Sequence, residues 1–296
     1  MTTTSNGARL AVRKTFKLYI GGAFPRTESG RYMTETTPDG TFVAHLCRAS
    51  RKDLRNAVVV ARKAQGGWAK RTGFNRAQIL YRMAEMLEGQ RARFVEALST
   101  RADYDADEAG AEVDATIDRL VWYAGWGDKF AQAFGSINPV AGPYFDFSMP
   151  EATGVVSIFA PENAPLLGLV STIAPVIISG NTCVVVASGT GASIAIDLAE
   201  VLALSDLPGG VVNLLTGQRD ELVPHAATHQ DIDGLLIAGP TPEQHRLVDT
   251  EAATTMKRVK VIVDLDRAAW RTDAAQSPMR ILPFVEFKTA WHPMGM

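Results

Sequence analysis

The chain has 296 residues, of which 46% are hydrophobic and 21% charged, which is ordinary for a globular protein with a large core. Its formal net charge of −2 gives no electrostatic basis for binding nucleic acid or an anionic membrane. The longest apolar stretch, Leu166–Ser179, is too short to span a bilayer. Only two cysteines occur, so we expect a cytoplasmic protein without a disulfide scaffold.

The first half of the chain begins with a polar, basic stretch and continues with helical patterns. Residues 1–15 are predicted to be a disordered tail. The segment Leu18–Phe24 alternates and then turns, as a short strand or hairpin would. Three helices are predicted next: one that begins with a Ser50/Asp53 capping box, one that begins near Asn75, and one over Val113–Ala124. We expect these helices to cover a sheet.

From Gly154 the pattern changes to short, branched apolar runs that alternate with amphipathic stretches. The predicted strands are Val155–Phe159, Cys183–Val186, Val211–Leu215, Leu235–Ile237 and Val259–Leu265. The predicted helices are Pro165–Ile178, Ala192–Ala203, Asp220–Ala227 and Pro242–Thr254. This alternation is typical of a parallel sheet buried on both faces. We therefore predict an α/β, Rossmann-like fold over residues 16–138 and 154–268.

Two segments, 139–153 and 281–296, each contain an amphipathic strand outside this sheet. Their apolar side chains alternate, with Phe145, Phe147 and Met149 on one face of the first strand and Val285, Phe287 and Trp291 on one face of the second. Strands of this kind need a surface to bury against. We predict that both form an oligomerisation element, with packing on the chain's own domain as the alternative.

Several short motifs occur in a specific order and spacing. They are Leu18–Phe24, Trp68-Ala-Lys-Arg-Thr with Asn75–Leu80, Tyr123–Lys129, Gly154–Pro165, Ala174-Pro175 with Gly180-Asn-Thr182, Leu207–Asn213 and Phe287–Trp291. Together they resemble the aldehyde dehydrogenase family. The resemblance implies a cofactor-domain fold and a terminal oligomerisation strand. It places the family's catalytic domain where this chain has only a short polar stretch, 266–280, so we expect the catalytic domain to be absent.

The resemblance also implies where catalytic groups would lie. Asn163 keeps the position of the family's oxyanion asparagine, but the catalytic base position falls on Ile262. No cysteine follows Cys183, which we expect to be a small core residue. Cys47 follows His45 closely, but the pair lacks the third, orienting group that an activated nucleophile needs. We therefore expect Asn163 to be a vestigial position that ties down a loop, and no catalytic residue to remain.

The cofactor positions implied by the resemblance are degenerate. Val186 and Gly189 fall where the family has a lysine and a glutamate that bind the ribose, and neither offers a polar side chain. Gly239-Pro240 replaces the start of the phosphate-binding turn, and proline lacks an N–H. We expect no cofactor, with NAD binding as an unfavoured alternative. His225 and His229 are four apart, but without a third ligand they indicate a solvated helix end and no metal site.

These features favour a non-catalytic subunit that assembles with, and supports, a full-length NAD(P)-dependent aldehyde dehydrogenase. The resemblance is to the non-catalytic downstream half of two-domain aldehyde dehydrogenases, so we expect no stand-alone activity. The expected partner is a full-length subunit or a second copy, bound through the hairpin and the terminal strand. Two alternatives stay open: a divergent dehydrogenase active only within a hetero-oligomer, and a small-molecule sensor that uses the vestigial cofactor cleft.

Overall fold

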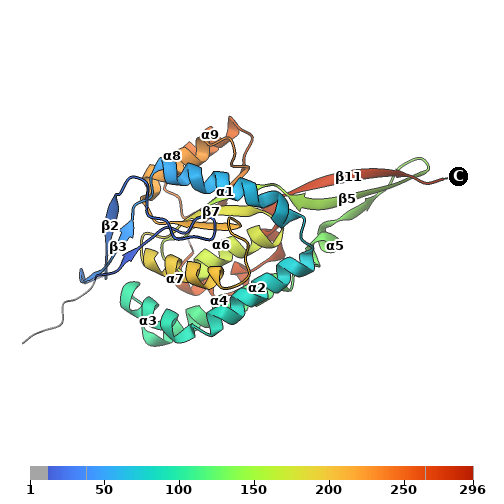
Figure 1. The fold of residues 1–296 in the computed structure, drawn as a ribbon. Coiled ribbons are helices and arrows are strands. Elements are labelled where there is room, and N and C mark those ends of the chain that lie inside the picture. The colour runs from blue at the N-terminus through green and yellow to red at the C-terminus, as the bar shows by residue number, and fades with distance from the viewer. Residues whose placement is uncertain (1–12, 38, 264, 296) are drawn as a thin grey trace, which may run out of the picture.

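The computed structural model describes residues 13–37, 39–263 and 265–295, so residues 1–12 of the predicted tail lie outside the described part. At its centre is a five-stranded parallel sheet in the order β10-β9-β6-β7-β8 (Figure 1). The strands are β6 (Val155–Phe159), β7 (Thr182–Val186), β8 (Val212–Leu215), β9 (Gly234–Ala238) and β10 (Arg258–Ile262). Every residue of β6 to β9 is buried, because helices cover both faces. The predicted α/β fold is confirmed.

Two helical layers enclose the sheet (Figure 1). One layer contains α1 (Arg51–Ala69), α8 (Arg219–Thr228) and α9 (Pro242–Ala253). The other contains α2 (Gly73–Glu88), α3 (Arg91–Arg101), α4 (Ala106–Ala124), α6 (Leu167–Ile178) and α7 (Ala192–Ala203). The layers enclose separate apolar cores. The predicted helices form, but the three early ones do not make one cover, because α1 lies on the face opposite α2 and α4.

The first helix begins where its sequence predicts. Ser50 Oγ accepts from the N–H of Lys52 and Asp53, while Asp53 Oδ2 accepts from Ser50 N at 2.8 Å. This capping box satisfies donors that no helical carbonyl reaches. It fixes the start of α1 at the carboxyl edge of the sheet, where Ala49 N donates to Thr216 O at 2.8 Å.

A small N-terminal sheet was not expected from the sequence. It contains β1 (Thr15–Phe16), β2 (Tyr32–Thr36) and β3 (Phe42–Cys47) in the order β1-β3-β2. The segment Leu18–Phe24, predicted to be a short strand or hairpin, forms a tight hairpin turn at Gly21-Gly22, with isolated bridges in place of a regular strand. Tyr19 instead exchanges two backbone hydrogen bonds with Leu214 of β8, at 2.8 and 2.9 Å, which anchors the segment to the main sheet.

A second small sheet, the antiparallel ribbon, projects away from the body of the molecule (Figure 1). It contains β4 (Ser136–Asn138), β5 (Tyr144–Ala152) and β11 (Val285–Pro293) in the order β11-β5-β4. The short helix α5 (Phe130–Phe134) leads into it, and α10 (Arg267–Trp270) with three 3₁₀ turns leads from β10 to β11. Within the described residues, no helix combines the length and apolar character that crossing a membrane requires.

Candidate functional site

The carboxyl edge of the parallel sheet contains the strongest candidate site. The chain runs from β6 to β7 and β8 on one side, then returns to β9 on the other side of β6. Open α/β sheets bind ligands outside the strand ends at such a reversal. A hollow of about 310 Å³ opens beside this edge and contains Glu162, Gly189 and Arg219 in its wall. The N-terminal sheet closes another side of the hollow through Met33 and Glu35.

A carboxylate and a guanidinium come together in this hollow from the loop after β6 and from the start of α8. Arg219, the first residue of α8, donates from Nη1 to Ala160 O at 3.2 Å and from Nη2 to Ala238 O at 2.5 Å. Its guanidinium therefore joins the ends of β6 and β9 and lies at the switch point. Glu162 Oε1 is 3.6 Å from Arg219 Nη1, while Glu162 Oε2 accepts from Gly189 N at 2.5 Å. The carboxylate thus lies beside Gly189.

Glycine at position 189 makes room for this carboxylate. A Cβ atom there would lie 3.0 Å from Glu162 Oε2, which is tighter than ordinary van der Waals contact. The Glu162 carboxylate therefore lies close to where a side chain at position 189 would begin. Sequence reasoning singled out neither Glu162 nor Arg219 as a site residue. The available signal was that both immediately follow buried strands, whose carboxyl ends meet at one edge.

Of the other predicted cofactor positions, Gly239 directly follows Ala238, whose carbonyl accepts from Arg219, whereas Val186 is buried. Val186 ends β7 and is buried in the apolar core beneath α1. Gly239 and Pro240 lead into α9, where Thr241 and Gln244 form a capping box with each other. The first-turn donors of α9 are therefore partly used by the helix's own side chains, at 3.2 Å for each bond. The guanidinium of Arg219 brings a positive charge to this region.

Asn163 connects two loops at the same edge. Its Nδ2 donates to Leu265 O at 2.5 Å, and its own carbonyl accepts from Tyr104 Oη at 3.0 Å and from Arg267 Nε at 3.2 Å. Within the described residues, Asn163 Oδ1 is buried without a hydrogen-bond partner. The residue therefore fixes the loop after β6 to the segment that follows β10.

A buried carboxylate lies behind this loop. Glu112 of α4 is fully buried, and its Oε1 accepts from Leu167 N at 3.1 Å at the start of α6. Burial raises the pKa of Glu112 above its ordinary value. Neither cysteine has the features of an activated nucleophile, because Cys47 and Cys183 are both buried and burial raises the pKa of the Cys183 thiol.

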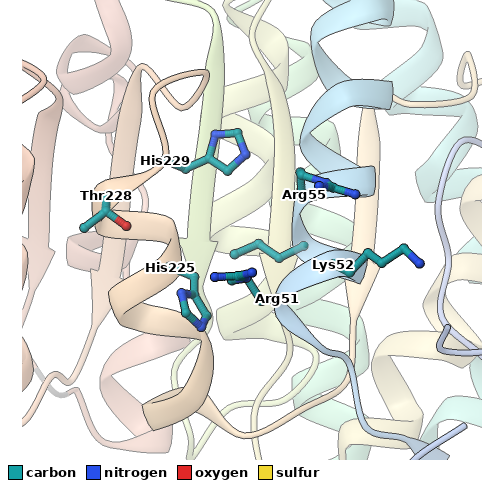
Figure 2. Close-up of a pocket in the computed structure, with 7 residues that line it drawn as sticks. Arg51, Lys52, Arg55, His225, Thr228 and His229 are labelled. Atoms are coloured by element: carbon teal, nitrogen blue, oxygen red, sulfur yellow. The ribbon is translucent and has the colours of Figure 1, made fainter. Parts of the chain in front are cut away.

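The two histidines singled out by their spacing lie elsewhere, on α8 and its C-cap. They face the first turns of α1 across a hollow that contains Arg51 and Arg55 (Figure 2). Across the three described ranges, no three His, Cys, Asp or Glu side chains gather closely enough to hold a metal ion.

The ribbon exposes apolar side chains on both of its faces. In the register of β5 and β11, Phe287 pairs with Pro150 and Trp291 with Asp146, so both aromatics share one face. The opposite face carries Met149, Phe147 and Phe145, which pair with Lys288, Ala290 and His292. Exposed fractions are 61% for Trp291, 52% for Phe287, 48% for Met149 and 40% for Phe145, while Phe147 is half-buried.

Val285 differs from the other predicted interface residues. It is only 1% exposed and packs within the chain's own core, because β11 starts against the main body before the ribbon projects. Its proposed place at an interface with another chain was therefore wrong.

Comparison with known proteins gives a consistent picture. The family model described as "Aldehyde dehydrogenase family" matches residues 25–263. The putative aldehyde dehydrogenase DhaS of Bacillus subtilis is 28% identical over 280 residues, which cover 93% of this chain and 54% of that protein. D-glyceraldehyde dehydrogenase (NADP(+)) of Thermoplasma acidophilum is 26% identical over 244 residues, covering 82% and 49%. The NAD+ complex structure of aldehyde dehydrogenase from Bacillus cereus superposes with a TM-score of 0.79 at 24% identity, over 84% of this chain and 51% of that one.

These relatives correct the expectation of a chain without activity. The chain spans about half the length of DhaS and of the Thermoplasma enzyme. The two relatives named above are dehydrogenases, so the expectation of a non-catalytic subunit was wrong. The non-catalytic assignment depended on the missing cysteine and catalytic base. The chain spans only about half of these two relatives, so their absence here is no evidence of inactivity. The sequence match, the parallel sheet and the ribbon agree: the chain belongs to the aldehyde dehydrogenase family.

Proposed function

We propose that this chain carries the dinucleotide-binding domain of an aldehyde-oxidising oxidoreductase, and that the hollow at the carboxyl edge is its NAD(P) site. The observation that supports it is the pairing of Glu162 and Arg219 at the switch point, 3.6 Å apart. A hollow of about 310 Å³ is at the lower end of the usual size of small-molecule sites. The Bacillus cereus neighbour, described as an NAD+ complex, has this fold.

The residues present suit the polar parts of a dinucleotide. A carboxylate accepts hydrogen bonds from ribose hydroxyls, and Glu162 offers one beside Gly189. A guanidinium binds phosphate oxygens strongly, and Arg219 offers a positive charge between the ends of β6 and β9. Both contacts come from positions other than those the resemblance implied, so this proposal replaces the expectation that no cofactor binds.

The other residues at this edge keep the loop that carries Glu162 in place. When bound, the nicotinamide would accept a hydride from the aldehyde carbon. Asn163 fixes the loop that carries Glu162, through its bond to Leu265 O. The buried start of α6 and the Glu112 carboxylate support the same loop from behind. The two buried thiols fit a reducing compartment, so we place the enzyme in the cytoplasm.

The proposal includes assembly through the ribbon. β11 is an edge strand of nine residues, and eight of them are exposed. Such an edge extends a neighbouring sheet by main-chain hydrogen bonds, while apolar side chains add specificity. The partner is a second copy or a full-length aldehyde dehydrogenase subunit.

Titration with NAD+ and NADP+, followed by calorimetry, tests the nucleotide site. We expect saturable binding of at least one dinucleotide, and affinity about tenfold lower in Glu162→Gln, the equivalent of about 1.4 kcal/mol. Glu243→Gln removes the same charge from an exposed position on α9 and is the matched control. Arg219→Lys, which keeps the charge but not the fork, should also weaken binding while a thermal melt verifies folding. Failure of both dinucleotides to bind, or equal binding by wild type and Glu162→Gln, contradicts the proposal.

A further inference from the structure

A second hollow, the basic hollow, lies between α1 and α8 on the outer helical layer (Figure 2). Its volume is about 320 Å³, roughly ten times the share of liquid that one water occupies. Its walls combine Arg51 and Arg55 from α1 with His225 and His229 from α8 and its C-cap, and Leu54 adds an apolar surface. Arg51 extends toward His225 in Figure 2, whereas Lys52 extends away from it.

Among the described residues, the two arginines of this hollow lack the carboxylate partner that the nearby Arg31 and Arg48 have. Arg31 and Arg48 both pair with Glu221 of α8, at 2.6 and 2.8 Å. In the described part of the chain, neither Arg51 nor Arg55 has a carboxylate oxygen within 4.0 Å. The full chain contains slightly more acidic than basic residues, so this local excess of positive charge is not a consequence of composition.

The acidic side chains of α1 and α8 all have other partners. Asp53 of α1 is buried and holds Ser50 and Thr27. Glu28 pairs with Lys52 at 3.2 Å. On α8, Glu221 is held by two arginines and Asp220 accepts from Gln244 Nε2 at 2.6 Å. The carboxylates of α1 and α8 are therefore engaged away from Arg51 and Arg55, which leaves these two guanidinium groups able to bind an external anion.

The histidines add hydrogen-bond donors to the two guanidinium groups. His229 Nδ1 accepts from Asp231 N at 3.2 Å, so a neutral ring carries its proton on Nε2. Burial lowers the pKa of His229, and Lys257 and Arg55 lower it further against an opposing contribution from Asp231. The ring is then neutral at pH 7 and offers Nε2–H as a donor. The N-terminus of α1, a helix of 19 residues, adds partial positive charge at the same side.

We infer that the basic hollow is a binding site for a phosphate-bearing small molecule, with the phosphate between Arg51 and Arg55. Two planar guanidinium forks match the oxygens of a phosphate, and the imidazoles offer further donors. The volume exceeds that of a single phosphate, and Leu54 supplies a surface for an apolar part of the ligand. This site lies on the helical layer and is separate from the hollow of Glu162 and Arg219, so it does not depend on the proposed function.

Calorimetric titration with inorganic phosphate and with pyrophosphate, at constant ionic strength, tests the inference. We expect saturable binding of pyrophosphate that is at least about tenfold weaker in the double variant R51Q/R55Q. The matched control is K63Q/R246Q, which removes the same charge from exposed positions on α1 and α9 and should bind as wild type does.

Two further arms separate specific binding from the alternatives. R51Q/R55Q should leave NAD(P) binding unchanged, whereas Arg219→Lys should weaken NAD(P) binding and keep the pyrophosphate binding that R51Q/R55Q removes, so failure of one site is distinguishable from failure of the other. His225→Gln, which keeps a donor but not the ring, should weaken pyrophosphate binding less than the arginine variant does. Absence of saturable binding into the millimolar range, or an equal loss in K63Q/R246Q, overturns the inference.

Discussion

Replacement of Trp291 by serine tests whether the ribbon is an assembly surface. The indole is 61% exposed, and its ring centroid lies 5.8 Å from that of Tyr144. An aromatic side chain buries roughly 200 Å² when enclosed, so about 120 Å² of Trp291 is open to a partner. At ~25 cal/mol per Å² this corresponds to about 3 kcal/mol for each buried copy. Association should therefore weaken by roughly 100-fold for each copy of the side chain at the interface.

Sedimentation velocity over a concentration series measures this effect. Wild-type protein should associate with itself or with a co-expressed full-length subunit, and Trp291→Ser should shift the midpoint to higher concentration. Leu204→Ser is the matched control, because Leu204 is 58% exposed at the end of α7, away from the ribbon. The reasoning is refuted if wild type and Trp291→Ser sediment alike at all concentrations, or if Leu204→Ser weakens association as much.

Two predictions concern stability. Burial raises the pKa of Glu112 above its ordinary 4.5, so the folded state binds this proton more tightly than the unfolded state. Wild type should therefore lose stability relative to Glu112→Gln as pH rises above about 4.5. Urea unfolding of both proteins between pH 4 and pH 8 should show two diverging stability curves, and parallel curves would exclude this linkage. Gly73→Ala would place a Cβ 2.0 Å from Gly127 O, so we expect a loss of about 1–3 kcal/mol by thermal melting. Gly66→Ala, where nothing lies within 4 Å, should be neutral or stabilising; a melt that ranks the two glycine variants the other way would contradict the packing described.

The parallel half of the fold could be predicted from the sequence because its signals are local. β6 and β7 are continuous apolar runs, and α7 occupies the predicted range Ala192–Ala203. The N-terminal sheet could not be predicted in this way. Tyr32–Thr36 is mostly polar, and only its pairing with β3 makes it a strand. The burial of Val285 depends likewise on the point at which β11 projects from the main domain. The alternation of apolar and polar residues along the strand does not indicate that point.

The candidate site was missed for a different reason. Val186 and Gly189 lack the polar side chains that the family has at these positions, so a comparison of single positions predicts no ribose contact there. Side chains, however, act where their atoms lie, and a long side chain from a neighbouring loop can supply a charge at a position that has none of its own. Glu162 does this beside Gly189, where a larger residue would press against the carboxylate.

The same distinction separates a lost residue from a lost function. Proline at 240 removes a backbone donor from the α9 start, but Arg219 brings a full positive charge to the end of β9, which leads into α9, at 2.5 Å from Ala238 O. A guanidinium there is a stronger partner for a phosphate than a single amide. If dinucleotide binding is lost in Glu162→Gln and Arg219→Lys while Gly239→Ala and Pro240→Ala leave it intact, the contacts have moved between elements. If instead Pro240→Ala strengthens dinucleotide binding and the two charge variants leave the affinity unchanged, the phosphate binds at the start of α9.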